Sequence, residues 1–226
     1  IQCAQINHLI IKDSAEPLQI FKMSSPSGII EDFLKEALPK KCSYTSQVYP
    51  FKRMLKLMKD QTIKHWINYG AKSWSTVQVS RPSITPLLFA NNNLLTKAPN
   101  KANSLKALLG KTVILITGFN YPGLEKHIKL GKIKAFYVKD YDSALNALSK
   151  NRGFAFVGMD FRLRYTIKSL FLEKKNFVFN DFSHVIAGTN IHLTYSKDFP
   201  TEMKKYLDQK IYEFKKSGKL KAIIRK

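Results

Sequence analysis

The order of apolar and polar positions predicts alternating strands and helices along most of the chain. A strand-like start over residues 1–11 is followed by a helix over residues 29–38, whose apolar side chains recur at helical spacing on one face. A strand then opens at Cys42, and Pro50 stands where a proline readily begins a helix. A short strand over residues 66–69 completes a β-α-β-α-β series.

A second series of the same kind follows a turn-rich stretch over residues 71–90. Its elements are again short and again alternate between strand and helix. We expect a strand over 91–96, a helix over 104–109, a strand at 113, a helix over 124–130, a strand over 133–138, a helix over 142–149, a strand over 153–158 and a helix over 160–171. A late strand over 192–196 and a helix over 202–217 close the chain.

This pattern predicts an α/β protein of two lobes, each a mixed, mainly parallel sheet flanked by helices. We expect lobe 1 to span residues 1–90 and lobe 2 to span residues 91–191, with residues 192–226 returning to lobe 1. Two crossings, near Asn91 and near His192, would form a hinge. Because open α/β sheets hold ligands at the carboxyl ends of their strands, the loops after those strands are the first candidates for function.

The stretch over residues 111–126 is the most informative of these loops. A β-branched apolar run ends in a turn over residues 118–123 that contains Gly118 and Gly123, and a charged helix start follows. Free backbone N–H groups at a helix N-terminus suit a carboxylate or a phosphate. An ordinary turn between strand and helix is the alternative, since Gly and Pro are common in such turns.

Charge and hydropathy narrow the class of protein. The formal net charge is +22, but Lys and Arg are spread from Lys12 to Lys226, without the concentrated run or basic helix face of a nucleic-acid binder. We therefore expect no nucleic-acid partner. No apolar run approaches the roughly 18 residues of a membrane span. The chain begins without Met and shows no charged-then-apolar leader, so we expect that any export signal has been removed.

The two cysteines, Cys3 and Cys42, each lie at the start of an expected strand. With a helix between them these strands should be parallel neighbours, which favours a disulfide bond and an oxidising compartment. A bridge closing this loop would be worth about 4 kcal/mol in the chain-entropy model. Two separate buried thiols are the alternative.

Motifs for catalysis or metal binding are absent from the sequence. The five histidines stand far apart and show no zinc-ligand spacing, and neither a nucleophile elbow nor a Walker loop is present. The closest carboxylates, Glu31 with Asp32 and Asp140 with Asp142, fit helix starts or surface turns better than an acid/base pair. We therefore predict no enzyme, no metal site and no cofactor.

Several motifs, in this order and spacing, resemble the type II periplasmic solute-binding proteins, specifically the extracellular solute-binding family 3 of receptors for polar amino acids. Residues 27–33 and 49–55 resemble the starts of that family's first two helices, and residues 104–113 resemble the start of its second lobe. Gly118, Phe119, Asn120 and Tyr121 resemble its ligand loop in that lobe, and residues 215–223 are similar to its C-terminal signature. The resemblance implies two lobes that close around a small polar solute.

The resemblance also shows three departures. Members that bind amino acids usually offer an Arg to the ligand carboxylate at the position of Val77, and the nearest Arg is Arg81. They commonly place an Asp for the ligand ammonium at the position of Met159, and Asp160 follows it. A hydroxyl site near the third strand is replaced by Lys72.

The expected ligand-binding residues follow from these loops. From lobe 1 and lobe 2 they are Phe21, Tyr69, Gly70, Lys72, Trp74, Arg81, Gly118, Phe119, Asn120, Tyr121 and Asp160. Most have a structural alternative: a core role for Phe21, packing against the adjacent helix for Phe119 and Tyr121, a loop anchor for Trp74, a solvated cation for Lys72, a surface pair for Arg81 and a helix cap for Asp160.

The sequence thus predicts a periplasmic, monomeric receptor that delivers an amino acid or related carboxylate to a membrane ABC transporter permease. An enzyme on the same scaffold, similar to dehydratases, is one alternative. A ligand-sensing domain of a signalling system is another.

Overall fold

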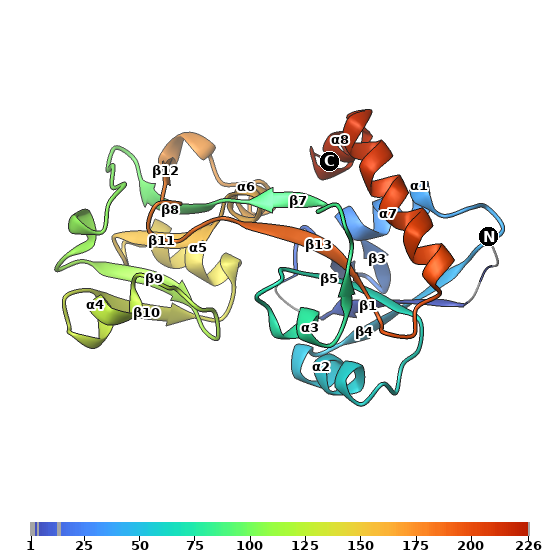
Figure 1. The fold of residues 1–226 in the computed structure, drawn as a ribbon. Helices are drawn as coiled ribbons and strands as arrows, with labels where there is room; N and C mark the ends of the chain where they lie inside the picture. Colours follow the sequence, from blue (N-terminus) through green and yellow to red (C-terminus); the bar gives the residue numbers. More distant parts are fainter. Residues whose placement is uncertain (1–2, 4, 13–14, 226) are drawn as a thin grey trace. The chain divides into compact units, whose positions relative to one another are not determined.

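The computed structural model describes residues 3, 5–12 and 15–225. They form two compact units, one of Ile1–Phe89 with Asn190–Lys226 and the other of Ala90–Thr189. Each unit has its own mixed sheet with helices packed against it, as the labelled ribbon in Figure 1 shows. The expected α/β architecture is therefore confirmed.

The sheet of the first unit contains three parallel strands and an antiparallel side. The parallel strands are β1 (Ile6–Ile11), β4 (Tyr44–Tyr49) and β5 (Trp66–Gly70). The strand order is β4-β1-β5-β13-β6, where β13 is Thr189–Tyr195, β6 is Arg81–Pro82, and β7 (Leu88–Ala90) also pairs with β13. Because β4, β1 and β5 run in the same direction, their carboxyl ends meet at one edge, and β13 runs antiparallel to β5.

Helices cover both faces of this sheet. They are α1 (Ile29–Ala37), α2 (Phe51–Lys59), α3 (Ser75–Gln78), α7 (Thr201–Lys216) and α8 (Lys219–Arg225). Neighbouring residues of β1 point to opposite faces: Leu9 packs in a buried cluster with Met54 and Met58 of α2, whereas His8 contacts Glu31 of α1. In Figure 1, α1, α7 and α8 lie on one side of the sheet and α2 on the other.

A hairpin of β2 (Ile20–Lys22) and β3 (Ser25–Ser27), which is not among the predicted elements, precedes α1. Its two-residue turn, Met23 and Ser24, has φ angles of 50° and 60°. Such turns usually contain Asn or Gly, which tolerate positive φ, so this pair carries no hairpin signal.

The sheet of the second unit has the order β10-β9-β11-β8-β12. The strands β10 (Lys134–Val138), β9 (Thr112–Ile116) and β11 (Ala155–Met159) are parallel, and β8 (Asn92–Lys97) and β12 (Phe177–Asp181) complete it in antiparallel pairs. Strand β12 was missed in the sequence. It is a short edge strand without alternating burial, which leaves no period-two signal.

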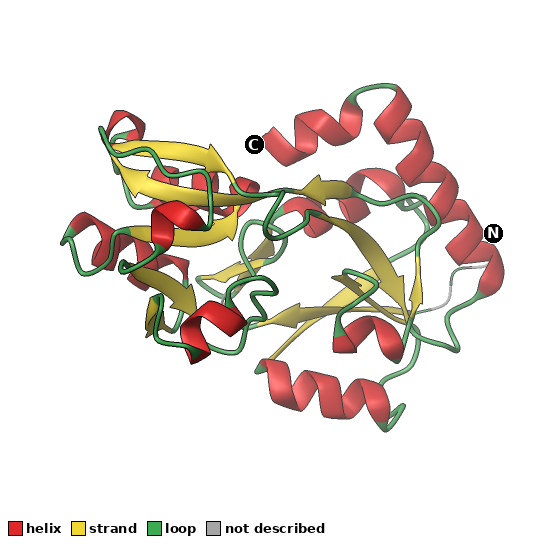
Figure 2. Cartoon of the chain, turned by 60° about the vertical axis from the view of Figure 1, so that its left-hand side comes forward, coloured by secondary structure: helices red, strands yellow, loops and turns green. Residues whose placement is uncertain are grey.

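Alternate residues of β9 divide the core of this unit into two layers. Val113 and Leu115 pack under α4 (Glu125–Lys129), while Ile114 and Ile116 pack under α5 (Tyr141–Ser149) and α6 (Asp160–Ser169). In Figure 2 the yellow strands of this unit lie between these red helices. The segment expected as a helix over 104–109 is only a 3-10 turn, η1 (Lys106–Leu108), and a second, η2 (Lys174–Asn176), precedes β12.

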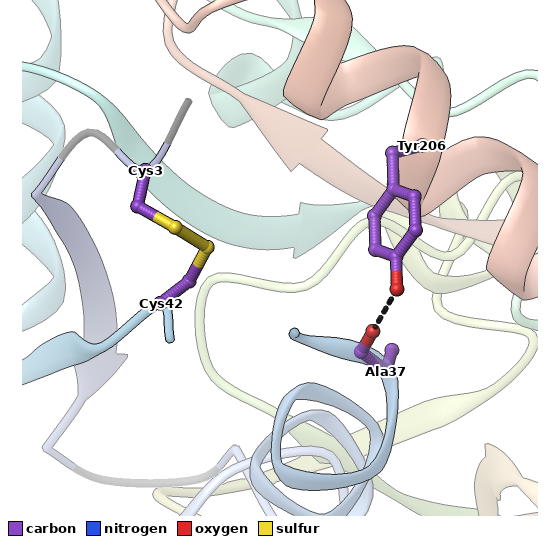
Figure 3. Close-up of a disulfide and its surroundings, with 4 residues drawn as sticks. All are labelled: Cys3, Ala37, Cys42 and Tyr206. Carbon is purple, nitrogen blue, oxygen red and sulfur yellow. Dashed lines mark hydrogen bonds between the residues drawn. A yellow bond between two sulfur atoms is a disulfide. The ribbon is translucent and has the colours of Figure 1, made fainter. Parts of the chain in front are cut away.

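Cys3 and Cys42 form a disulfide bond, with 5.2 Å between their Cα atoms. They stand just before the paired strands β1 and β4, so the predicted juxtaposition is confirmed, although neither cysteine belongs to its strand. Figure 3 shows the bridge and a hydrogen bond of 3.0 Å from the Tyr206 hydroxyl of α7 to the Ala37 carbonyl at the end of α1. Both contacts reach the chain at the C-terminal end of α1, the bond at its last residue, Ala37, and the bridge shortly after it at Cys42.

Candidate functional site

The parallel strands of the first unit end together at Tyr49, Ile11 and Gly70. The loop after β1 returns through Gln19, whose side-chain amide donates to the Leu9 carbonyl at 2.6 Å and accepts from the Ile11 amide at 3.1 Å. These two bonds hold the beginning of the β2–β3 hairpin at the end of β1. Phe21 of that hairpin is 38% exposed, so its ring is available to a ligand.

The end of β5 and the turn after it carry four of the expected residues, Tyr69, Gly70, Lys72 and Trp74. Tyr69 is buried, and its ring packs edge-on against Trp74 with 6.1 Å between centroids. The Trp74 amide donates to the Ala71 carbonyl at 2.8 Å, which closes the turn. Lys72 projects from this turn and is exposed. Tyr69 and Trp74 therefore act as structural supports of a loop that presents Lys72.

Arg81 is placed elsewhere. In the register of β6 with β13 it pairs with Tyr195, which pairs in turn with Ile67 near the amino end of β5. Its guanidinium donates to the carbonyl oxygens of Ser196, at 3.4 Å, and Phe199. The structure does not bring Arg81 to the edge where Lys72 lies, because the antiparallel return of the chain turns it toward the opposite edge.

His192 is a residue of this edge that sequence reasoning missed. It pairs with Gly70 in the register of β13 with β5, it is buried, and its Nδ1 lies 2.8 Å from the Ser83 carbonyl. Burial lowers the pKa of His192, the bond to Ser83 opposes this, and the charges of Lys72 and Lys215 lower the pKa further. A neutral imidazole therefore lies beside the turn that carries Lys72. No linear motif marks it.

A second missed feature lies at the end of β4. Phe51, the first residue of α2, is 44% exposed. The guanidinium carbon of Arg53 lies 5.8 Å from the centroid of the Tyr49 ring. The helical spacing of Phe51 with Met54, Leu55 and Met58 predicts core packing; Met54 and Met58 are buried, but Phe51 is not.

In the second unit the parallel strands β10, β9 and β11 end side by side at Val138, Ile116 and Met159. The loop that begins at Gly118 follows β9, and Asp160 follows β11, the neighbouring strand. The structure therefore brings these two expected elements to adjacent positions on one sheet edge.

Within the loop after β9, buried and exposed residues have different roles. Tyr121 is buried, and its hydroxyl accepts a hydrogen bond from the Ile116 amide at 2.8 Å. Phe119 is 41% exposed and Asn120 is exposed. Gly118 has a φ of 82°, a conformation that favours glycine. Tyr121 thus anchors the loop to the strand end, and Phe119 and Asn120 face solvent.

The expected anion site at the helix N-terminus is altered in the structure. Helix α4 has only five residues, and the Glu125 carboxylate of its first turn accepts from the Tyr121 amide at 3.0 Å. A carboxylate of the chain itself therefore takes the position that an anionic ligand would need. Among the described residues, no protein acceptor is bonded to the Gly118, Asn120 or Gly123 amides, which leaves these as the donors of the loop.

Asp160 is the first residue of α6, and the cap position is Met159. The Asp160 carboxylate lies 4.0 Å from Nε of Arg164, and its side chain is 31% exposed. The Met159 amide donates to the Tyr141 hydroxyl at 2.9 Å, so a tyrosine holds this strand end as Tyr121 holds that of β9.

Arg162, also missed in the sequence, is buried, with its guanidinium carbon 5.7 Å from the centroid of the Tyr141 ring. Arg162 places a cation in the first turn of α6, close to the strand end that Tyr141 holds. No local sequence signal marks Arg162, because its burial depends on the packing of α6 against Tyr141.

Two further properties bear on the class of protein. Within residues 3, 5–12 and 15–225, no three His, Cys, Asp or Glu side chains converge as a metal site would require. None of the helices in this described part combines the length and apolarity needed to cross a bilayer.

The chain is similar in structure to several solved binding proteins. A probable amino-acid ABC transporter extracellular-binding protein, YtmK from Bacillus subtilis, matches with a TM-score of 0.76 and 14% identity over 98% of this chain and 96% of that one. A mutant of ArgBP from T. maritima matches with a TM-score of 0.70 and 18% identity over 97% of this chain and 93% of that one. The periplasmic VFT2 domain of BvgS from Bordetella pertussis matches with a TM-score of 0.72 and 13% identity over 98% of this chain and 92% of that one.

No protein-family model and no curated protein matches the sequence. These likenesses span nearly the whole length of this chain and of each solved structure. They confirm the architecture implied by the resemblance in sequence. The chain has the fold of the type II periplasmic binding proteins.

Proposed function

We propose that this protein is an extracytoplasmic receptor that binds a small polar solute and delivers it to a membrane ABC transporter. The observation that carries the proposal is the likeness, over 98% of the chain, to an extracellular-binding protein of a probable amino-acid ABC transporter. The Cys3–Cys42 disulfide supports an oxidising, extracytoplasmic compartment such as the periplasm. We further propose that the receptor acts as a monomer.

In this proposal each unit has candidate ligand contacts in its own carboxyl-end loops. The first unit contributes Lys72 as a point charge and Phe21 as an aromatic wall, while Tyr69, Gly70 and Trp74 shape the loop that carries Lys72. Arg81 has no ligand contact, because its guanidinium is engaged by backbone carbonyls of its own unit.

The second unit contributes the amide of Gly118, the side chain of Asn120 and the exposed ring of Phe119. Asp160 supplies a carboxylate for a cationic group of the solute, and Tyr121 positions the loop. Val77 and Met159 stand where receptors of this kind usually have charged clamps, and Val77 is buried. We therefore propose an amino acid or related carboxylate bound by a lysine and neutral donors instead of a bidentate arginine.

Calorimetric titration of the refolded, ligand-free protein tests this proposal, after a thermal-shift screen of amino acids, small peptides, organic acids and sugar acids. A ligand at one hundred times its dissociation constant stabilises the native state by about 2.7 kcal/mol. We expect one saturable class of ligand with 1:1 stoichiometry. The variants Lys72→Gln and Asn120→Ala, one in each unit, should each weaken binding at least tenfold.

Matched controls are Lys216→Gln, on the exposed face of α7, and Asn146→Ala, on the exposed face of α5. Each should change the affinity less than twofold. If no compound of the panel binds saturably, or if the controls weaken binding as much as the two site variants, the proposed receptor function is wrong.

A sensory role is a second candidate, because the VFT2 domain of the sensor protein BvgS shares the fold. Both roles need a bound solute, but they differ in the membrane partner. Photo-cross-linking of the liganded protein in native membranes distinguishes them: a transporter permease as the product supports delivery, and a signalling receptor as the product supports sensing.

A further inference from the structure

The second unit contains a hollow at the sheet edge opposite to its candidate site. This cavity, of about 370 Å³, lies where β9 and β11 begin and where β8 ends. Its lining includes three cations and three further side chains, Lys97, Lys111, Arg152, Asn100, Asn151 and Phe154. We refer to it as the cationic cavity. Thr112 and Ile116, the two ends of β9, are about 13 Å apart at 3.3 Å per residue, so the cavity is separate from the loop at Gly118.

The positive charge of the cationic cavity is uncompensated. No carboxylate lines it. The ion pairs formed in the described part of this unit join other residues, namely Lys139 with Asp140, Arg164 with Asp160 and Lys175 with Glu173. Lys97, Lys111 and Arg152 therefore gather three positive charges in one hollow without an internal counter-charge.

Neutral contacts hold two of these cations in place. The Lys97 ammonium donates to the Ser149 carbonyl at 3.1 Å and to Oδ1 of Asn151 at 2.9 Å. The Lys111 ammonium lies 5.4 Å from the centroid of the Phe154 ring. Because these partners are neutral, they orient the side chains and leave their charges to attract an anion.

Further cations surround the same edge. Lys132 and Lys134 stand at the start of β10, and Lys174 precedes β12. All three are exposed. Like charges around a hollow raise the local positive potential and concentrate anions there.

We propose that the cationic cavity is a second binding site, which takes the phosphate group of an anionic ligand. Arg152 offers the planar fork that matches a phosphate, and the two lysines add point charges. A cavity of about 370 Å³ is within the range of small-molecule pockets and exceeds the space of a bare phosphate. An organic part of the ligand would lie beside Phe154. The phosphate belongs either to a free phosphorylated compound or to a phospholipid headgroup.

Titration of the full chain with inorganic pyrophosphate at constant ionic strength tests the site. Amide NMR shifts and calorimetry measure the binding. We expect saturable 1:1 binding, with the largest shifts at Gly110, Lys111 and Gly153. The triple variant Lys97→Gln, Lys111→Gln and Arg152→Gln should bind at least tenfold more weakly. The double variant Lys111→Gln and Arg152→Gln changes only exposed residues, so it tests the site even if the Lys97 change disturbs folding. It should weaken binding at least threefold.

The matched control removes the same net charge from exposed residues of this unit outside the cavity, by Lys126→Gln, Lys129→Gln and Lys168→Gln. It should change the affinity less than twofold. Equal weakening in the control would mean that net charge alone attracts the anion, and would overturn the proposal, as would the absence of saturable shifts at the cavity with every probe.

Sedimentation with vesicles distinguishes the two sources of phosphate. Phosphatidylglycerol vesicles should pull down the protein through the cavity, and phosphatidylcholine vesicles should not, if a headgroup is the ligand. If pyrophosphate binds but neither vesicle does, the ligand is a free phosphorylated compound. Both results support the site, and vesicle binding that the triple variant does not reduce contradicts a headgroup ligand.

Discussion

Nδ1 of His8 lies 3.1 Å from Oε2 of Glu31, and both side chains are buried in the first unit. The Ile11 amide orients the Gln19 side chain, whose nitrogen lies 3.0 Å from Nε2 of His8. Nε2 therefore accepts a hydrogen bond, and Nδ1 carries the proton that it donates to Glu31. Burial alone would raise the pKa of Glu31, but hydrogen bonds from His8 and Tyr44 and the nearby charge of Lys35 lower it, so the carboxylate is ionised.

Replacement of Glu31 by Ala should destabilise the protein by about 3–5 kcal/mol, because removing one partner of a buried polar cluster leaves the others unsatisfied. Urea denaturation at pH 7 measures the change in the free energy of unfolding. Asp60→Ala is the control, since Asp60 pairs with Lys56 on the surface of α2, and it should leave the midpoint nearly unchanged. A Glu31 variant as stable as this control would show that the buried cluster contributes nothing.

The stability of the protein should fall as the pH decreases through about 6.5, the ordinary pKa of histidine in an unfolded chain. The pKa of His192 is lowered by burial in the native state, so the unfolded state takes up the proton first on acidification. Urea midpoints between pH 7.5 and pH 5 should decline more steeply for the wild type than for His192→Asn. The control His184→Asn, at an exposed position, should follow the wild type. Parallel curves for all three proteins would contradict this prediction.

Tyr121→Phe should cost about 1–3 kcal/mol, because it leaves the buried Ile116 amide without its acceptor. The matched control Tyr137→Phe removes a hydroxyl from a half-exposed side chain in the neighbouring strand β10. It should change the free energy of unfolding by less than about 0.5 kcal/mol. Chemical denaturation followed by fluorescence measures both, and equal effects would mean that the Tyr121 hydroxyl is not a structural anchor.

Removal of the disulfide with the double variant Cys3→Ser and Cys42→Ser should lower the free energy of unfolding by about 4 kcal/mol, since the bridge closes a loop between residues 39 positions apart. Reduction of the wild type by a thiol should produce the same loss. Alkylation of two thiols in the native, unreduced protein would show that the bridge does not form in solution.

The elements of the fold that carried a complete local signal were predicted from the sequence. Helix α2 begins after a proline and α1 ends before one, and both have apolar residues at helical spacing. The β2–β3 hairpin was missed because its turn, Met23 and Ser24, is stabilised by pairing of its strands and not by its own preference for positive φ. Local pattern therefore identifies an element only where its residues favour the same conformation as the fold.

The candidate site was predicted only as far as topology determines it. The placement of Gly118 and Asp160 at neighbouring strand ends follows from the β-α-β pattern. The direction of a side chain does not: Tyr121 points into the core and Phe119 into solvent, although both are aromatic residues of one turn. The cationic cavity joins Lys97 to Arg152, which are distant in sequence, through the antiparallel pairing of β8 with β11.

The continuous unit Ala90–Thr189 interrupts the residues of the other unit, and strand β13 belongs to the sheet whose first strands end near residue 70. On a ribosome, which synthesises the chain from its N-terminus, the inner unit has all its residues by Thr189, where β13 begins, whereas β1, β4 and β5 are made before the inner unit. The inner unit can therefore fold while the chain is still being made. Until β13 is available, β5 has an unpaired edge. A chaperone that covers this edge would act during the interval in which residues 90–189 are made.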